Sequence, residues 1–587
     1  MRPPFAILDF PTSAARQQEG SLHFAAPDRI LTARVLADVV PVLQEVDAAS
    51  RAGKHAVGFV SYEAAPAFDV AFTSRAPQVD RGELPLAWFG VFDTHEVVRA
   101  GETSPAAHAG WRERIGRTEF DRAIAAIRDA IGRGDVYQVN FTALLDVDVR
   151  GDHGALYHRL LAAQGPGYGA RIHTGRHEIL SASPELFFDR RGAHITAKPM
   201  KGTARRGRWS TEDESRALAL ASSPKERAEN VMIVDLLRND LGRVAVAGTV
   251  AVPALFDVER RPTVLQMTST VTATLRNDVR LADLFTALFP CGSVTGAPKV
   301  AATQMIAALE SAPRGVYCGA IGHVAPGGDA TFSVAIRTLV IDHERRTAVY
   351  GVGSGITWDS APELEYDEVV AKAGILTHDL PQFDLIETLR LEHGRYARLD
   401  RHLTRLEASA DYFGFTPAKA LRVGATEALL AHAQRAGSVS QRVRVRVAPD
   451  GRAVIDYESL PTPSAMPVRV ALASSPVRET NRFLYHKTTH RAVYDRHRAE
   501  HAGAFDVLLW NEAGNLTEFT IGNVVLELDG TRATPPRACG LLAGVFREEL
   551  LDHGVITERT LTRDDVHRAT RMWLINSVRE WVEVRCD

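Results

Sequence analysis

A long helical pattern in this chain stops within residues 376–383, where Pro381 interrupts it. The residue before a proline is biased away from the helical conformation, so this segment predicts a joint between two folded units. At 587 residues the chain is also too long for one hydrophobic core. We therefore expect two domains, a large one over residues 1–378 and a smaller one over residues 383–587.

Capping signals predict helices in the large domain. Ser223 and Ser360 each stand three residues before a glutamate, with a proline between, which is typical of a helix N-terminus. The predicted helices cover residues 120–131, 224–238 and about 361–376, and the predicted strands cover residues 319–323, 331–341 and 347–351. Because short strands do not alternate regularly with helices, we expect an α+β fold with antiparallel sheets.

The smaller domain has a similarly mixed pattern. Residues 441–447 alternate strictly, so Arg442, Arg444 and Arg446 share one face of a predicted strand. Turns separate further short strands between residues 507 and 535, which predicts a meander.

Composition excludes several classes of function. A formal charge of -3 shows no basic bias, which argues against nucleic acid as the main ligand. The four cysteines are far apart and lack zinc or redox spacing, as expected in a reducing compartment. No apolar run reaches about 18 residues and the N-terminus has no signal pattern, so we expect no membrane segment. The composition favours a cytoplasmic enzyme.

Two predicted helices carry carboxylates that need an explanation. Glu229 lies in a helix that is apolar almost all round, and a buried carboxylate is costly unless it meets a cation. That cation is either a nearby arginine or a hard metal ion. Glu368 and Lys372 are four residues apart on another helix, where they form a surface ion pair or face a site. Two carboxylates joined by substrate and water oxygens are a ligand set that Mg²⁺ prefers.

A series of short motifs extends through the large domain in a fixed order. They cover residues 137–142, 183–185, 198–203, 225–230, 235–240, 292–299, 335–338, 353–356 and 359–360. In this series the large domain resembles the chorismate-utilising enzymes, which include synthases for anthranilate, aminodeoxychorismate, isochorismate and salicylate.

Lys201, in the motif Lys198-Pro-Met-Lys-Gly-Thr203, distinguishes between members of that family. The members that make anthranilate or isochorismate carry a small residue here. A lysine resembles component I of the aminodeoxychorismate synthases, in which it attacks ring carbon C2 as the C4 hydroxyl leaves. A neutral amine is required, and we expect the cations Arg337 and Lys372 to depress its pKa. Attachment at C2 leaves only C4 open to ammonia.

The resemblance also implies roles for other residues. Glu229 and Glu368 would hold Mg²⁺, and Glu185 would act as acid or base near the departing hydroxyl. The substrate-binding residues would be Arg337, Lys372, Gly353, Gly355 and Thr295. Gln266 stands where many relatives carry a histidine, and glutamine cannot relay a proton. Either that histidine is dispensable for this product or proton transfer falls to Glu185.

The reaction needs a source of ammonia. A glutaminase requires a reactive cysteine in a nucleophile turn. Cys291 belongs to one of the matched loops, and Cys318, Cys539 and Cys586 lack the required Gly-x-Cys-x-Gly setting. We therefore expect a separate glutamine amidotransferase subunit or free ammonia.

A second series of motifs extends through the smaller domain. It covers residues 386–390, 400–406, 485–491, 515–518, 534–536, 540–545 and 576–579. This series resembles the class IV enzymes that use pyridoxal 5'-phosphate, a group that includes transaminases and aminodeoxychorismate lyase. Residues 383–386 stand almost at the start of the domain, so the first strands of that family are missing or merged with the joint.

The second resemblance implies a cofactor site. Lys487 would bind the cofactor covalently, Glu518 would pair with its pyridine nitrogen, and Arg405 would bind its phosphate. Ser577 and the backbone N–H groups around Val545 and Phe546 would assist at the phosphate. Taken singly, these residues also fit a surface lysine, a strand-end charge and a helix-surface cation.

Together the two resemblances imply synthesis of p-aminobenzoate, a folate precursor. The large domain would convert chorismate and ammonia to 4-amino-4-deoxychorismate, and the smaller domain would expel pyruvate. Two alternatives stay open: an anthranilate-type synthase fused to an amino-acid transaminase, and a synthase with a non-catalytic C-terminal module. A homodimer is possible, because lyases of this class tend to pair.

Overall fold

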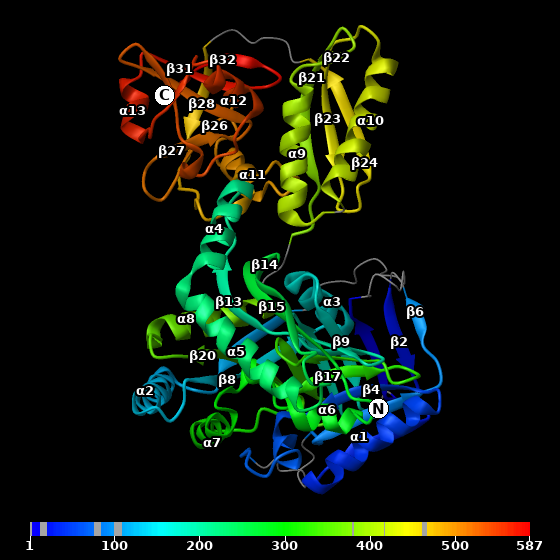
Figure 1. The fold of residues 1–587 in the computed structure, drawn as a ribbon. Coiled ribbons are helices and arrows are strands. Elements are labelled where there is room, and N and C mark those ends of the chain that lie inside the picture. The colour runs from blue at the N-terminus through cyan, green and yellow to red at the C-terminus, as the bar shows by residue number, and fades with distance from the viewer. Residues whose placement is uncertain are drawn as a thin grey trace. The chain divides into compact units, whose positions relative to one another are not determined.

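The computed structural model describes residues 3–11, 20–75, 84–98, 108–377, 381–415, 417–460 and 467–586. The chain forms two compact units of mixed helix and sheet, whose elements are labelled in Figure 1. One unit comprises Met1–Arg205 and Ala217–Leu380, and the other comprises Arg206–Arg216 and Pro381–Asp587. No sequence pattern indicated that residues 206–216 belong with the second unit. Part of the predicted joint, residues 378–380, lies outside the described residues.

Two sheets of ten strands each build the first unit. The first has the order β16-β8-β20-β19-β10-β9-β1-β2-β6, with β7 beside β8. Its strands are β16 (Gly296–Ala297), β8 (Gln138–Arg150), β20 (Thr347–Ile356), β19 (Thr338–Asp342), β10 (His177–Ser183), β9 (Tyr168–His173), β1 (Phe5–Asp9), β2 (Ser21–Ala25), β6 (Glu96–Val98) and β7 (His108–Glu113).

The second sheet has the order β13-β15-β12-β11-β18-β17-β4-β5-β3, with β14 beside β15. Its strands are β13 (Met200–Arg205), β15 (Val264–Thr274), β12 (His194–Lys198), β11 (Leu186–Arg191), β18 (Ala330–Val334), β17 (Ala320–Val324), β4 (His55–Val60), β5 (Ala87–Phe92), β3 (Arg29–Ala33) and β14 (Ala251–Arg260). Among the described residues both sheets pair antiparallel throughout, as the sequence predicted.

The strand predicted over residues 331–341 is in fact two strands in different sheets. β18 ends at Val334 in one sheet and β19 begins at Thr338 in the other. Between them Arg337 adopts a φ of 52°, a left-handed conformation that is costly for a residue with a Cβ atom. The chain therefore changes sheets at Arg337, and backbone strain is concentrated at a predicted substrate-binding residue.

The helices of the first unit are α1 (Leu36–Arg51), α2 (Arg117–Arg133), α3 (His153–Gln164), α5 (Pro224–Gly242), α6 (Leu281–Leu288), α7 (Lys299–Leu309) and α8 (Pro362–Ala373); α4 (Ser210–Ser222) begins in the segment that belongs to the second unit. The cap predicted at Ser223 is present, because its side chain accepts a hydrogen bond from the backbone N–H of Glu226. The cap predicted at Ser360 is wrong: α8 has Ala361 as its N-cap, and the Ser360 hydroxyl instead accepts from the Thr357 N–H at 3.1 Å.

The burial of α5 sets where its carboxylates lie. Ile233, Val234 and Leu237 are buried in the large core of the first unit. Glu226 and Glu229 lie nearer the N-terminus of the helix, on the same side as Ile233, and are partly buried. The buried apolar side chains thus fix the position of α5 and, with it, the positions of the Glu226 and Glu229 carboxylates.

The second unit contains two further sheets. One has the order β22-β21-β23-β24 and is accompanied by two helices. These elements are β22 (Arg395–Tyr396), β21 (Leu385–Glu392), β23 (Gln441–Val447), β24 (Ala453–Ser459), α9 (Leu399–Phe413) and α10 (Ala418–Ala436). Leu389, Leu406 and Val443 share their core. In it α9 packs on β21, and α10 packs on β23, the strand that carries the predicted alternation.

The other sheet has the order β27-β26-β25-β32-β31-β28-β29-β30, and an added pairing of β27 with β28 closes six strands into a ring. Its elements are β27 (Leu516–Phe519), β26 (Val507–Trp510), β25 (Val468–Leu472), β32 (Glu580–Cys586), β31 (Arg571–Asn576), β28 (Gly522–Leu528), β29 (Thr531–Thr534), β30 (Thr557–Glu558), α11 (Ala492–Glu500), α12 (Val545–Asp552) and α13 (Arg563–Arg568). Antiparallel pairing is not universal here, because β25 runs parallel to both of its neighbours.

Residues 206–216 are held in the second unit by polar contacts. The Tyr412 hydroxyl donates to the Gly207 carbonyl at 2.7 Å. Arg208 Nη1 donates to the Tyr485 hydroxyl at 3.1 Å. Tyr485 stands two residues before Lys487, so this segment supports the loop that carries the predicted cofactor lysine.

Among the described residues, no helix combines the length and apolar character needed to cross a membrane.

Candidate active sites

The first unit contains a cavity of about 230 Å³ that gathers most of the residues predicted for chorismate. The predicted residues that line it are Glu185, Lys201, Glu229, Arg337, Gly353, Gly355, Glu368 and Lys372. Thr295 does not line it, because its side chain is fully buried and its hydroxyl donates to the Cys291 carbonyl at 2.9 Å. Thr295 supports the loop, and its neighbour Ser293 reaches the cavity instead.

Lys201 lies on an irregular part of the edge strand β13. Pairing with β15 shifts register between Met200 and Thr203, and Gly202 has a φ of 92°. A β-bulge re-aims the side chain of a strand residue. A Cβ atom on Gly355 would stand 2.9 Å from Lys201 Nζ, so the glycine leaves room for the amine.

The pKa of Lys201 is lowered chiefly by burial. Lys372 adds to this effect, whereas the carboxylates of Glu229 and Glu185 oppose it. Of the two cations expected to lower this pKa, Lys372 does so, whereas Arg337 is not among the main causes; desolvation of the amine is the largest.

Glu185 is buried and accepts a hydrogen bond from the Ser293 hydroxyl at 2.5 Å. Burial raises its pKa to about 7, although Ser293 and Lys201 act in the opposite direction. A carboxyl group with such a pKa can donate or accept a proton near neutral pH. The position therefore fits an acid–base group facing the amine of Lys201.

Besides Glu185, four glutamates line the same cavity, and two of them were not predicted. Glu226 precedes Glu229 by three residues on α5, and Glu365 precedes Glu368 by three residues on α8. Helical spacing could have found them, because residues three apart share a face. Burial raises the pKa of Glu229, and Glu226 and Glu365 raise it further.

This carboxylate cluster fits a hard divalent cation. Repulsion among the glutamates is relieved when a cation lies between them, and oxygen ligands from two helices suit Mg²⁺. Glu368 also pairs with Lys372 at 2.6 Å. Lys372 Nζ in turn donates to the Gly353 carbonyl at 2.7 Å. Lys372 is therefore held by the backbone and orients the Glu368 carboxylate.

Two other polar side chains of the cavity form hydrogen bonds to neighbouring protein groups. Arg337 Nη1 donates to the side-chain oxygen of Gln164, at the end of α3. Gln266 Nε2 donates to the Gly202 carbonyl at 2.9 Å. Gln266 therefore supports the turn beside Lys201.

The second unit contains a larger cavity of about 590 Å³. The predicted residues that line it are Arg405, Lys487, Glu518, Val545 and Ser577. α12 begins at Val545 with Gly544 as its N-cap, as predicted. Phe546 does not line the cavity: its ring is buried beside Val525 and Trp573, under the Arg398 guanidinium.

Lys487 and Glu518 have strongly shifted pKa values in this cavity. Burial, with Arg405 and Arg491, lowers the pKa of Lys487 to about 7. Burial raises the pKa of Glu518 to about 8, against a hydrogen bond from the Tyr494 hydroxyl at 2.7 Å. Within the described residues no lysine or arginine forms an ion pair with Glu518, so a cationic group of a ligand would fit beside it.

Arg405 is oriented by partners that sequence analysis did not assign. Its guanidinium donates to both oxygens of Glu387, at 2.8 and 2.7 Å, and to the Ala543 carbonyl. His402 Nδ1 shares the same carboxylate at 2.7 Å, and its Nε2 is buried without a partner. Glu387 lies in the motif of residues 386–390, so the sequence contained a signal that could have identified Glu387 as a site residue.

A group of arginines also lines the second cavity. They are Arg442, Arg444, Arg491, Arg498 and Arg579. Burial lowers the pKa of Arg444, and the nearby Arg442 and Arg491 lower it further. Cations that repel one another in a cavity favour a polyanionic ligand.

The buried cysteines are poor nucleophiles. Burial raises the pKa of Cys291 and of Cys318 to about 12, and it also raises the pKa of Cys539. A reactive cysteine requires the opposite shift.

Comparison with known proteins agrees with this geometry. Residues 96–378 match the model of the chorismate binding enzymes, and residues 384–586 match that of amino-transferase class IV. Anthranilate synthase component 1 of Methanothermobacter thermautotrophicus is 34% identical over 347 residues, which cover 54% of this chain and 72% of that protein. The chain belongs to the chorismate-binding enzymes. Its second unit carries the class IV amino-transferase domain, so the family membership predicted for both units is confirmed.

This chorismate-binding enzyme is also similar to aminodeoxychorismate synthase component 1 of Salmonella typhimurium, with 40% identity over 279 residues. That match covers 46% of this chain and 60% of the relative, so the chain spans well under the relative's full length. Anthranilate synthase component I of Streptococcus pneumoniae aligns with a TM-score of 0.53 and 24% identity, covering 64% of this chain and 93% of that one. The alignment shows that the two share a fold.

Proposed function

We propose that this chain makes p-aminobenzoate in two steps. The first unit converts chorismate and ammonia to 4-amino-4-deoxychorismate, and the second unit eliminates pyruvate from that product. The observation that carries the proposal is the placement of Lys201 in one cavity with Glu185 and the glutamate cluster. The similarity to aminodeoxychorismate synthase component 1 supports the same conclusion.

In the first step the neutral amine of Lys201 forms a bond to ring carbon C2. Both ring double bonds shift by one position and the C–O bond at C4 breaks, while Glu185 gives the departing hydroxyl a proton, so that water leaves. Ammonia then forms a bond to C4, both double bonds shift back, and the C2 bond to Lys201 breaks. Glu185 recovers its proton from the added ammonium.

The charged groups of this cavity would hold the dianionic substrate. Arg337 and Lys372 would bind the ring carboxylate, and Glu229 and Glu368 would hold Mg²⁺, with Glu226 and Glu365 beside them. The ion would neutralise and orient the substrate's negative charge. The space at Gly355 lets the Lys201 amine approach the ring.

In the second step residues of the second cavity would hold pyridoxal 5'-phosphate and the aminated product. Arg405, Ser577 and the N-terminus of α12 would bind the phosphate, and Glu518 would keep a proton on the pyridine nitrogen. Bound there, the cofactor supplies an electron sink for the amine-bearing carbon. Lys487, with its lowered pKa, would take the proton from C4. The C3–O bond then breaks, the ring becomes aromatic, and the released enolpyruvate takes up a proton to give pyruvate.

The arginines favour a lyase over an amino-acid transaminase. The substrate of the lyase carries two carboxylates, and the cofactor adds the negative charge of its phosphate to the same cavity. Arg442, Arg444 and Arg579 line the cavity and suit such charge. A transaminase for apolar amino acids would need an apolar lining instead.

Ammonia would come from a separate glutamine amidotransferase subunit or from solution. The raised pKa values of the buried cysteines support an external source.

One incubation tests the proposal. Purified protein is given chorismate, ammonium, Mg²⁺ and pyridoxal 5'-phosphate, and the products are separated by chromatography. We expect p-aminobenzoate and pyruvate in equal amounts. Formation of ortho-aminobenzoate would contradict the role of Lys201. Accumulation of aminodeoxychorismate without pyruvate, or a requirement for 2-oxoglutarate, would contradict the lyase assignment.

A further inference from the structure

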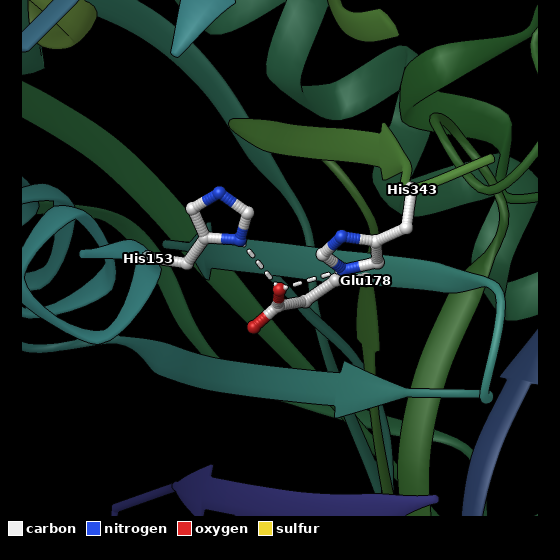
Figure 2. A group of neighbouring side chains, drawn as sticks. All are labelled: His153, Glu178 and His343. Carbon is white, nitrogen blue, oxygen red and sulfur yellow. Dashed lines mark hydrogen bonds and ion pairs between the residues drawn. The ribbon is translucent and has the colours of Figure 1, made fainter. Parts of the chain in front are cut away.

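Three metal-ligating side chains converge outside both cavities of the enzyme. His153 is the first residue of α3, Glu178 lies in β10, and His343 directly follows β19. Figure 2 shows both imidazole rings directed at one carboxylate. His153 Nδ1 lies 2.6 Å and His343 Nε2 lies 3.2 Å from the same atom, Glu178 Oε2.

We propose that His153, Glu178 and His343 bind a divalent transition-metal ion of the Zn²⁺ class. One ligand atom from each residue lies within 4.8 Å of the others, so small rotations would bring all three onto one ion. Two imidazole nitrogens and one carboxylate oxygen are a common protein ligand set for Zn²⁺. The His153 and His343 side chains are 24% and 35% exposed, which leaves a path for the ion and room for a water ligand.

The surroundings of Glu178 prepare its carboxylate for this role. Arg171 donates to the other oxygen, Oε1, from Nε at 2.7 Å and lies 2.7 Å from it through Nη2. Glu178 itself is buried, so its carboxylate has few positions to adopt. With Oε1 held by Arg171, Oε2 is the oxygen that faces the two histidines.

Arg171 also influences which ion would bind. A guanidinium next to the carboxylate opposes ions such as Mg²⁺ and Ca²⁺, which bind mainly through oxygen charge. Zn²⁺, Co²⁺ and Ni²⁺ gain more from imidazole nitrogen, so the histidines favour them. A partner on the second carboxylate oxygen is typical of the outer shell of metal sites.

A bound ion would connect elements that lead to the first cavity. α3 runs from His153 to Gln164, whose side chain accepts from Arg337. β19 begins directly after Arg337 and ends directly before His343. The ion would therefore brace both supports of Arg337 without contacting the substrate, and it would stabilise the first unit against unfolding.

The test is zinc binding to the full chain, free of any histidine tag and stripped of metal by a chelator. Zn²⁺ is added by calorimetric titration in excess Mg²⁺, which occupies the glutamates of the first cavity. We expect about one Zn²⁺ per chain and a rise in melting temperature. Co²⁺ should give visible absorption bands from nitrogen and oxygen ligands. In His343→Ala and His153→Ala we expect the affinity for Zn²⁺ to fall at least about tenfold.

His158→Ala is the matched control, because His158 is exposed on the same helix and outside the cluster. It should bind Zn²⁺ as the unaltered chain does. His343→Asn keeps a hydrogen-bond donor for Glu178 and guards against loss of folding. Equal Zn²⁺ affinity in the unaltered chain and in metal-free, folded His343→Asn would overturn the proposal, as would the absence of Zn²⁺ binding to the unaltered chain.

Discussion

The Nζ atom of Lys201 lies 2.9 Å from the point where a Cβ atom on Gly355 would stand. The same Cβ atom would stand 2.2 Å from Gln138 Nε2. Because a methyl group at residue 355 would displace both side chains, Gly355→Ala tests the position of the amine. A displacement near 1 Å can lower a rate by about 10²-fold, and we expect that loss in aminodeoxychorismate formation. Gly242→Ala is the control, since nothing lies within 4 Å of its Cβ position.

Removal of the Lys201 amine should abolish or divert amination. Lys201→Ala leaves C2 open, so the para product should fall by a factor on the order of 10³ or more, and any remaining product should include ortho-aminobenzoate. Chromatography of the products measures both. Lys198→Ala changes a lysine of the same loop that pairs with Glu259 outside the cavity, and it should retain the para product. Unchanged p-aminobenzoate synthesis in Lys201→Ala would refute covalent catalysis by this residue.

Lys487→Ala should stop synthesis one step later than Lys201→Ala. Aminodeoxychorismate should accumulate from chorismate while pyruvate release is lost, because no amine remains to hold the cofactor or to move the C4 proton. A pyruvate assay coupled to a dehydrogenase measures the loss. Lys419→Ala, an exposed lysine of α10, should release pyruvate at the normal rate.

Arg444→Gln should weaken substrate binding in the second cavity more than it slows the chemistry. Loss of a charge-assisted hydrogen bond costs about 1.5–3 kcal/mol, so KM for aminodeoxychorismate should rise about ten- to a hundredfold. Arg446→Gln is a close control: it shares the strand, pairs with Asp456 at 2.9 Å and does not line the cavity. A fall in kcat with KM unchanged would assign Arg444 a different role.

Glu185 should make the stability of the first unit depend on pH. Its pKa rises from 4.5 to about 7 on folding, so the neutral form is favoured in the folded state. Its stabilising contribution is full below pH 4.5 and is lost as the pH rises through 7. The loss is about 3 kcal/mol, because each pKa unit corresponds to about 1.4 kcal/mol. Denaturant unfolding at pH 5 and pH 8 should show most of this decrease in the unaltered chain and a smaller one in Glu185→Gln.

Much of both sites could be predicted because their motifs are local. Lys201, Glu185 and Glu368 come from separate segments, yet each segment carries its own pattern, and the structure brings them to one cavity. Glu229 likewise lines that cavity from the predicted helix, α5. The family and the α+β fold followed from such patterns.

Other features depend on contacts that no local pattern reports. The change of sheets at Arg337 requires a left-handed φ, which sequence propensity opposes for arginine. Thr295 lies in an expected motif and Phe546 directly follows one, but their side chains lie in packed regions and only their neighbours reach the cavities. The alternation of residues 441–447 placed Arg444 on a strand face but did not indicate which cavity that face lines.

The assignment of residues 206–216 to the second unit limits how the gene could be divided. A fragment ending near residue 380 would keep Gly207 and Arg208 but lose Tyr412 and Tyr485, their hydrogen-bond partners. The complementary fragment, which would start near residue 381, would lack the residues that support its Lys487 loop. Two proteins obtained by cutting at the obvious boundary would therefore be poor substitutes for the fusion, and co-expressing them should recover the second activity only if the fragments reassociate.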